Sequence, residues 1–123
     1  MKKKPEIDLS MLDDEQRQAY YSKKFKSYIG LAAKAGKIAA GTNTCIFTMG
    51  KGRARLLIIA EDMAENSRDK LIFSAERSGV EYRVYGCADD LGHYTGNDGA
   101  GVICVTDDNF KKIIVETIDN TSK

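Results

Sequence analysis

The sequence of 123 residues is poor in the residues that build disulfide frameworks, metal centres and membrane spans. Its three cysteines, Cys45, Cys87 and Cys104, are an odd number without a CxxC spacing, so we expect free thiols. The single histidine, His93, offers little to a metal site. The longest apolar run, residues 56–60, is far shorter than the roughly 20 residues that a membrane-spanning helix needs. We therefore expect no metal, no cofactor and no membrane span.

The beginning of the sequence, MKKKPEIDLS, is basic, but no apolar signal segment follows it. Hydrophobic residues make up 42% of the chain and charged residues 30%, as in a globular domain that buries its core without disulfides or metal. We therefore expect a cytoplasmic protein with one folded domain, present as a monomer.

Acidic residues are missing from a long part of the chain. Between Gln16 and Ala60 there is no Asp or Glu, and Lys and Arg give this stretch a charge of +9. The residues before it carry −2 and those after it carry −6, which leaves the net charge of +1. Such segregation predicts a positive face, and nucleic acid is the commonest partner of such a face. The alternative is that folding spreads these charges around the surface.

Apolar residues recur at helical spacing in several segments. The first helix begins with the acidic residues 13–15, which suit the positive end of its dipole. Gly36 is its expected stop, and Gly30 offers an alternative break inside the pattern. A single helical turn is expected at 90–94. The residues expected to cap the later helices are Thr42 or Asn43, then Ser67, then Asp107 or Asp108.

Short apolar runs between these helices predict strands. Residues 55–60 and 102–105 are almost entirely apolar, as in strands buried on both faces. Strands are also predicted at 37–40 and 80–85, and a turn is predicted at 97–99. This alternation of helices and strands predicts a sheet with helices on both sides.

A polar helix start stands close to a basic cluster in the stretch GTNTCIFTMGKGRARLL, residues 41–57. A helix N-terminus presents free backbone N–H groups that can hold a phosphate or a base edge. The amide of Asn43 can donate and accept at once, and Gly41 lets another backbone come close. The stretch is no P-loop, because its glycine-lysine pair is followed by Gly52 rather than Ser or Thr.

Three stretches carry a resemblance to a known family: GLAAKAGKIAAGTNTC, GKGRARLLIIAEDMAENS and VEYRVYGCADDLGHYTG. Over residues 25–118 the chain resembles the L7Ae/L30e/S12e ribosomal-protein family, and in particular its bacterial YlxQ-like branch. The resemblance implies a three-layer α/β/α sandwich with a central four-stranded mixed sheet. It also implies binding of RNA, usually a kink-turn with tandem sheared G·A pairs. The domain is then expected at 25–123, behind an N-terminal extension at 1–24.

The resemblance implies an RNA surface in two parts. One is the start of the second helix, and the other is the loop from Gly86 to Asp90. In the family, the asparagine and the residue after it read guanine edges, and a basic residue meets phosphate. This fits the recognition of RNA by shape and splayed bases. The residues assigned in this way are Lys37, Gly41, Thr42, Asn43, Thr44, Lys51, Cys87 and Ala88, and Arg53 of the basic cluster is a further candidate.

The sequence departs from the family's pattern at several of these positions. Thr44 stands where RNA-binding members usually have Glu, and its hydroxyl brings no charge-assisted hydrogen bond. Glu81 replaces a usual proline, and Ala88 replaces a usual Lys, Arg or Gln. Asp89 and Asp90 put negative charges where phosphates would approach.

Two functions follow from these observations. The first is a non-enzymatic, ribosome-associated protein that binds ribosomal or other structured RNA, with the ribosome or its proteins as further partners. The alternative is a protein-interaction module that keeps the fold and has lost the RNA site.

Catalytic and cation-binding readings are weaker. Cys87 and His93 offer a nucleophile and a base, but no third group is evident that would orient the base. Asp89, Asp90 and Asp98 offer oxygen ligands, but their spacing matches no known cation-binding loop.

The tyrosines of the first helix are a further candidate for contact with nucleic acid. Tyr20 and Tyr21 stand close to Lys23 and Lys24, and aromatic rings beside cations can stack bases. Tyr28 follows the helical spacing of the apolar residues and is expected in the core.

Overall fold

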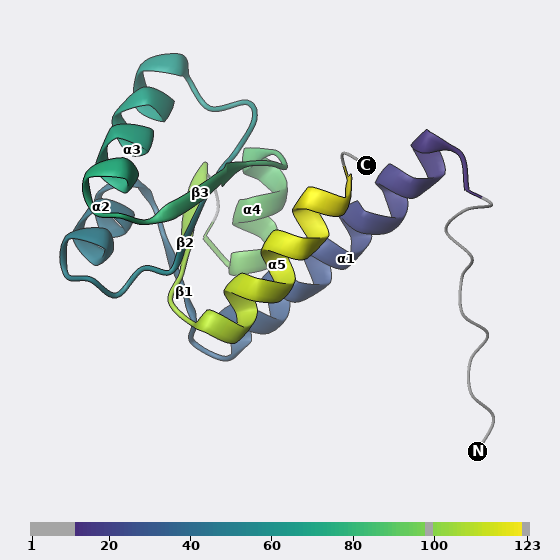
Figure 1. Cartoon of the computed structure of the whole chain (residues 1–123), viewed down its shortest axis with the longest axis horizontal. Helices are drawn as coiled ribbons and strands as arrows, with labels where there is room; N and C mark the ends of the chain where they lie inside the picture. Colours follow the sequence, from purple (N-terminus) through teal and green to yellow (C-terminus); the bar gives the residue numbers. More distant parts are fainter. Residues whose placement is uncertain (1–11, 98–99, 122–123) are drawn as a thin grey trace.

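Helices and strands alternate along the residues that the structure describes, 12–97 and 100–121 (Figure 1). The structure is a computed structural model. Its order of elements confirms the predicted alternation. The elements are α1 (Asp14–Lys34), β1 (Ile38–Ala40), α2 (Thr42–Gly50), β2 (Leu56–Ile59), α3 (Glu65–Arg77), β3 (Glu81–Val84), α4 (Ala88–Thr95), β4 (Val102–Val105) and α5 (Asp108–Thr121).

The four strands form one mixed sheet in the order β1-β4-β2-β3. β4 runs antiparallel to both β1 and β2, whereas β2 runs parallel to β3. Ile38 of β1 and Leu56 of β2 both lie opposite Val105, so β4 sets the register of the strands on its two sides. Every residue of β2 and β4 is buried, as their apolar runs predict.

A separate core lies on each face of the sheet. Successive side chains of a strand point to opposite faces, so β2 contributes to both cores. Leu56 and Ile58 pack in the first core with buried residues of α1, α4 and α5. Leu57 and Ile59 pack in the second core with residues of α2 and α3. The helices cover the two faces accordingly (Figure 1), and this is the predicted three-layer sandwich.

α1 begins with a reciprocal cap. The backbone N–H of Gln16 donates to Oδ1 of Asp13 at 2.7 Å, and the N–H of Asp13 donates to Oε1 of Gln16 at 3.1 Å. The helix continues through Gly30 without the alternative break and stops before Gly36, which has φ 73°. Because α1 runs across position 24 as one helix, the predicted boundary between extension and domain falls inside it, and that boundary stays a prediction.

α5 begins as the sequence predicts. Oδ2 of Asp107 accepts the backbone N–H of Phe110 at 2.9 Å, so the first of the two expected aspartates is the cap. Ile114 and Ile118 are buried, and Phe110 and Ile113 pack against the same core.

The predicted start of α3 is wrong. The helix begins at Glu65, and the backbone N–H of Arg68 donates to the carbonyl of Ala64 at 2.9 Å. Ser67 therefore lies inside the first turn and cannot cap it. The acidic Glu65 in that turn suits the positive end of the helix dipole instead.

α4 is longer than the single turn predicted at 90–94, because its backbone is already helical from Ala88. Gly96 ends it with φ 75° in the left-handed region. Beyond it, the side-chain N–H of Asn97 donates to the carbonyl of Thr95 at 3.1 Å. Residues 98–99, the rest of the predicted turn, lie outside the described residues.

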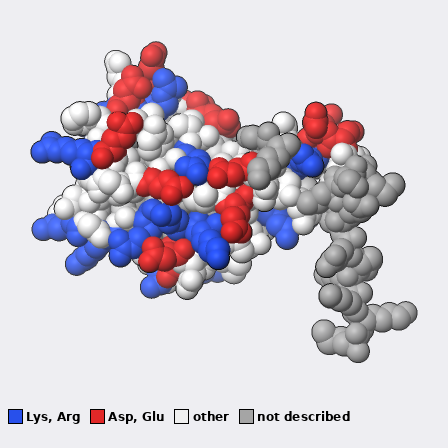
Figure 2. Space-filling view, viewed as in Figure 1, with Lys and Arg blue, Asp and Glu red and all other residues white. Residues whose placement is uncertain are grey.

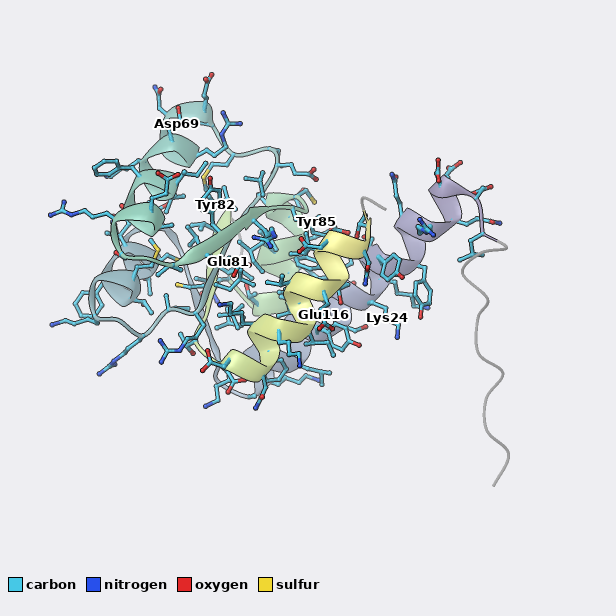
Figure 3. The ribbon with its side chains drawn as sticks, viewed as in Figure 1. Lys24, Asp69, Glu81, Tyr82, Tyr85 and Glu116 are labelled. Atoms are coloured by element: carbon cyan, nitrogen blue, oxygen red, sulfur yellow. The ribbon has the colours of Figure 1, made fainter. Side chains whose placement is uncertain are left out.

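Two tyrosines attach the edge strand β3 to both cores (Figure 3). Tyr82 packs against the core formed with α2 and α3. Tyr85 packs against the other core, where its ring centroid lies 4.7 Å from that of Phe25. The hydroxyl of Tyr85 also lies 3.4 Å from the hydroxyl of Thr121 at the end of α5.

Truncation of Ile58 tests the central position of β2. Because this side chain is fully buried, Ile58→Ala should lower the free energy of unfolding by about 2–5 kcal/mol in urea denaturation. Leu31→Ala on α1 is the control, because Leu31 is 55% exposed and its loss should cost at most about 0.5 kcal/mol. Equal costs for the two variants would contradict the arrangement of the core.

Candidate functional site

Short backbone contacts between loops form one end of the sheet. The N–H of Gly41 donates to the carbonyl of the first residue of β4 at 3.0 Å, and the N–H of Ala60 donates to Gly101 at 2.8 Å. The N–H of Glu61 donates to the carbonyl of Gly86 at 2.7 Å. We call this the glycine end, after Gly41, Gly86 and Gly101. It brings the starts of α2, α3 and α4 to the same end of the sheet.

The start of α2 is open. Gly41 is its N-cap, with φ 99° and ψ 151°, a conformation that glycine adopts and other residues avoid. The predicted caps Thr42 and Asn43 are wrong, because the turn from β1 into α2 falls at Gly41 and both residues are already helical. No side chain of the described residues caps this helix, so its first N–H groups lack acceptors. Asn43 and Thr44 are exposed beside them.

The start of α4 is occupied by a carboxylate. The backbone N–H of Ala88 donates to Oδ1 of Asp62 at 2.9 Å. Asp62 lies in the turn after β2, and its negative charge suits the positive end of α4. Cys87 is the N-cap residue, and both Cys87 and Ala88 are half-buried. An anionic ligand would meet Asp62 here, whereas no side chain of the described residues caps the start of α2.

Gly101, just before β4, lies close to the start of α4 and next to the residue that bonds to Gly41. A Cβ atom at Gly101 would lie 3.0 Å from Cε of Met63 and 3.9 Å from Cβ of Ala88. The next residue along β4 accepts the hydrogen bond from Gly41. The structure therefore brings the predicted residues 41–44 and 87–88 to the same end of the sheet.

The predicted basic residues lie at the opposite end, which we call the basic end after Lys37, Lys51 and Arg53. The carbonyl of Lys37 accepts the N–H of Thr106 at 2.9 Å, just beyond the end of β4. Arg53 lines a surface cavity together with Thr106. Along the axis of α2, Lys51 lies about 12 Å from Asn43. The structure thus separates these cations from Asn43 instead of joining all four in one patch.

Charge is distributed unevenly over the two outer helices of the second core. Figure 2 shows basic side chains along the edge of the molecule where α2 and the end of α3 lie, and acidic side chains where α3 begins. Arg77, near the end of α3, lines a groove with Gly50 and Gly52. It therefore adds a further cation close to the basic end.

One of the two aspartates in the predicted recognition loop is already paired. Oδ2 of Asp90 lies 3.3 Å from Nζ of Lys26 on α1, and both side chains are partly exposed. Asp89 is exposed. The expected repulsion between this loop and RNA phosphates is therefore reduced at Asp90. Asp62 adds a negative charge nearby that was not predicted from the sequence.

The groups considered for catalysis do not meet. Cys87 is the N-cap of α4, and His93 lies six positions later, about 9 Å further along the axis and on another side of the helix. The ring of His93 packs instead against Tyr94, with 5.0 Å between the ring centroids. Cys45 and Cys104 are fully buried, and a hydrogen bond with Cys104 together with burial raises the pKa of the Cys45 thiol.

Over residues 12–97 and 100–121, no three His, Cys, Asp or Glu side chains gather in a way that could hold a metal ion. Asp98, part of the acidic set considered above, lies outside these ranges. Within the same ranges, no helix combines the length and apolarity needed to cross a membrane.

The tyrosines of α1 lie away from the start of α2. Nζ of Lys24 lies 5.3 Å from the ring centroid of Tyr20, which packs edge-on against Tyr21. Tyr28 packs against the core, as predicted. Because α1 and α2 cover opposite faces of the sheet, these rings do not extend the surface around Asn43.

Two contacts that shape this site were not predicted from the sequence. Asp62 lies in the turn that follows a buried strand, a place from which a polar side chain can reach a neighbouring loop, and this position was its only signal. The pairing of Lys26 with Asp90 has no signal in the sequence, because it depends on how α1 packs beside α4.

Residues 23–115 match the model of the ribosomal protein L7Ae/L30e/S12e/Gadd45 family, and this range includes all four strands and both helix starts at the glycine end. The chain belongs to this family. The RNA-binding protein YlxQ of Bacillus subtilis (strain 168) is 28% identical over 91 residues, which are 74% of this chain and 91% of YlxQ.

Solved structures share the L7Ae-family fold of this chain. A protein of unknown function from Bacillus halodurans C superposes with a TM-score of 0.74 at 27% identity, over 78% of this chain and 97% of the other. The Giardia lamblia 15.5kD RNA binding protein superposes with a TM-score of 0.66 at 22% identity, over 94% of this chain and 98% of its own. At that identity the second likeness shows the fold alone.

The conformation of Gly41 can be tested in this L7Ae-family chain by adding a single methyl group. Gly41→Ala should lower the free energy of unfolding by about 1–3 kcal/mol, because the positive φ strains any residue with a Cβ. A steric clash adds nothing, since the nearest atom to the new Cβ would be Oγ1 of Thr44, at 3.9 Å. The control is Gly50→Ala at the end of α2, where a Cβ meets nothing within 4 Å. It should be neutral or stabilising by up to about 1 kcal/mol. Urea unfolding followed by circular dichroism measures both, and a neutral Gly41→Ala would refute the strained cap.

Proposed function

We propose that the protein is a non-enzymatic RNA-binding protein that recognises structured RNA of the kink-turn type through its glycine end. The observation that carries this proposal is the uncapped start of α2, with Asn43 and Thr44 exposed beside it. Membership of the L7Ae/L30e/S12e/Gadd45 family and the similarity to a protein named RNA-binding support it.

The chemistry of the α2 start suits a base edge in an opened RNA helix. Its first backbone N–H groups donate hydrogen bonds and carry the partial positive charge of the helix dipole. The amide of Asn43 both donates and accepts, so it can pair with a purine edge. The hydroxyl of Thr44 can also donate and accept, both through its single oxygen atom. These groups sit on a short helix fixed to the sheet, so they require little ordering on binding.

The basic end would hold the phosphates of the RNA beyond the kink. Lys51 lies about 12 Å from Asn43, so an RNA that places its opened bases at the glycine end must continue along α2 to reach it. Lys37 and Arg53 would then meet the same backbone. Cys87 and Ala88 would contact the RNA from the other side of the glycine end, without the charge that a Lys or Arg at 88 would supply.

The setting proposed for this activity is a cytoplasmic monomer associated with ribosomal RNA or ribosomal proteins. Neither a cofactor nor a catalytic residue belongs to the proposal, since recognition needs only hydrogen-bonding and charged groups.

A protein-interaction module is the second candidate. The capping of α4 by Asp62 favours it, because this carboxylate and the exposed Asp89 put negative charge beside the surface that would face phosphate. A partner recovered in a pull-down that survives nuclease treatment would support this reading. If nuclease removes every partner, the reading fails.

Replacement of Asn43 tests the RNA proposal. Asn43→Ala should weaken binding of a kink-turn RNA about 5- to 150-fold, the range expected when a two-bond contact to a base is lost. Asn109→Ala on α5 removes the same exposed amide from the opposite face of the sheet and should leave the affinity unchanged. Fluorescence anisotropy with a labelled RNA measures both variants.

Binding should also weaken steeply as salt rises. Each phosphate contact contributes about 0.7–0.9 to the slope of log K against log salt concentration. Lys51→Ala and Arg53→Ala should therefore each reduce the slope by about that amount, whereas Asn43→Ala should leave it unchanged. Absence of salt-sensitive binding to kink-turn, ribosomal or transfer RNA would sink the proposal.

The cysteines offer an independent footprint of bound RNA. Cys87 is partly accessible, whereas Cys45 and Cys104 are fully buried, so a thiol reagent should label the native protein at Cys87 first. When kink-turn RNA saturates the protein, it should slow this labelling at least about fivefold. A fully paired duplex of equal length is the control and should protect less. Equal labelling rates with both RNAs would place Cys87 outside the contact.

A further inference from the structure

Phe47 is a large aromatic side chain on the surface of α2. It is 62% exposed, although apolar residues elsewhere on this helix, such as Cys45 and Met49, are buried. Nζ of Lys51 lies 5.4 Å from the centroid of its ring, within the range of a cation–π contact. The ring is thus held beside a positive charge rather than packed into the protein.

Phe47 lies on the same face of α2 as Asn43 and Lys51. The three residues are spaced at i, i+4 and i+8, which places them in one row, with about 6 Å between neighbours along the axis. All three side chains are exposed. The row leads from the glycine end to the basic end, so Phe47 occupies the interval that separates the two.

From this arrangement we infer that Phe47 is a stacking platform for an unpaired nucleobase of the bound RNA. The base next to the one read at Asn43 would lie against the ring, and Lys51 would meet the phosphate that follows. This inference rests on the RNA-binding function proposed above and specifies how the RNA passes between the two ends. Stacking on an aromatic ring accepts any base, because every base has a π face.

The charge around the row favours a nucleic-acid occupant over a protein. α2 carries no acidic residue, and no Asp or Glu occurs anywhere from position 17 to position 60. At its far end the row meets Lys51 and Arg53, with Arg77 of α3 lining the adjoining groove. An aromatic ring between a hydrogen-bonding amide and a group of cations matches a strand of alternating bases and phosphates.

A second exposed phenylalanine supplies the contrast. Phe73 on α3 is 64% exposed, so its exposure matches that of Phe47. Its neighbours one turn away are of mixed charge: Asp69 and Lys70 before it, and Glu76 and Arg77 after it. A phosphate strand along this row would meet carboxylates, so Phe73 is the matched control for an exposed ring outside the RNA path.

The test compares four variants on a kink-turn RNA that carries 2-aminopurine at its unpaired positions. Phe47→Ala should weaken binding about 5- to 150-fold, the loss expected for one stacked base, with an unchanged salt slope because no phosphate contact is removed. Phe47→Tyr should bind as the natural protein does. Phe47→Leu, which keeps apolar bulk without the π face, should lose most of the affinity. Phe73→Ala should change nothing.

The fluorescence of one 2-aminopurine should fall when the natural protein binds and should stay high with Phe47→Ala. Urea denaturation should give the same free energy of unfolding for Phe47→Ala and the natural protein, since the ring is exposed, and this separates lost contact from lost folding.

The possible outcomes separate this inference from the proposed function. If Asn43→Ala abolishes binding but Phe47→Ala and Phe47→Leu bind normally, the stacking inference is wrong and the RNA-binding proposal stands. Normal binding by Phe47→Leu with weak binding by Phe47→Ala would make Phe47 an apolar contact and not a stacking platform. If the natural protein binds no RNA, both fall. Loss of a nuclease-resistant protein partner in Phe47→Ala, with RNA affinity unchanged, would assign the ring to a protein interface.

Discussion

The antiparallel pairing of β2 with β4 is the interaction on which the rest of the structure depends. Both strands are buried along their whole length, and each contributes side chains to both cores. β1 and β3 attach only to the outer sides of this pair. A slip of one residue would exchange the side chains that face the two helical layers, so the pairing also determines which residues meet each helix.

The same pairing positions the candidate site. β4 begins where β1 and β2 end, so its first residue accepts the N–H of Gly41, and Gly101 just before it accepts the N–H of Ala60. The starts of α2 and α4 differ in charge there. No side chain of the described residues caps α2, whereas Asp62 accepts the backbone N–H of Ala88 at the start of α4. In the proposed complex, the RNA would therefore engage α2 and keep its phosphates away from Asp62 at the start of α4.

Much of the fold could be predicted from local patterns, because those patterns reflect local physics. The apolar runs of β2 and β4 and the cap at Asp107 are examples. The predicted cap residues were wrong where backbone geometry determines the start of the helix. The positive φ of Gly41 starts α2, and α3 begins before Ser67. Residues 41–44 and 87–88 lie at the same end of the sheet, while their part in binding stays a prediction. Lys51 lies one short helix away from Asn43, as its spacing in the sequence predicts. The reach of Asp62 across 26 positions depends on tertiary packing alone.

The strand order has a consequence for how the chain acquires its shape during synthesis. Among the four strands of the described residues, β4 is made last, yet it lies between β1 and β2. Until it emerges, β1 has no strand to pair with, and β2 can pair only with β3. The glycine end then does not exist, because Gly41 finds its acceptor on β4. The proposed RNA surface is therefore complete only after β4 has been made, and its many contacts between distant residues favour slow, late folding.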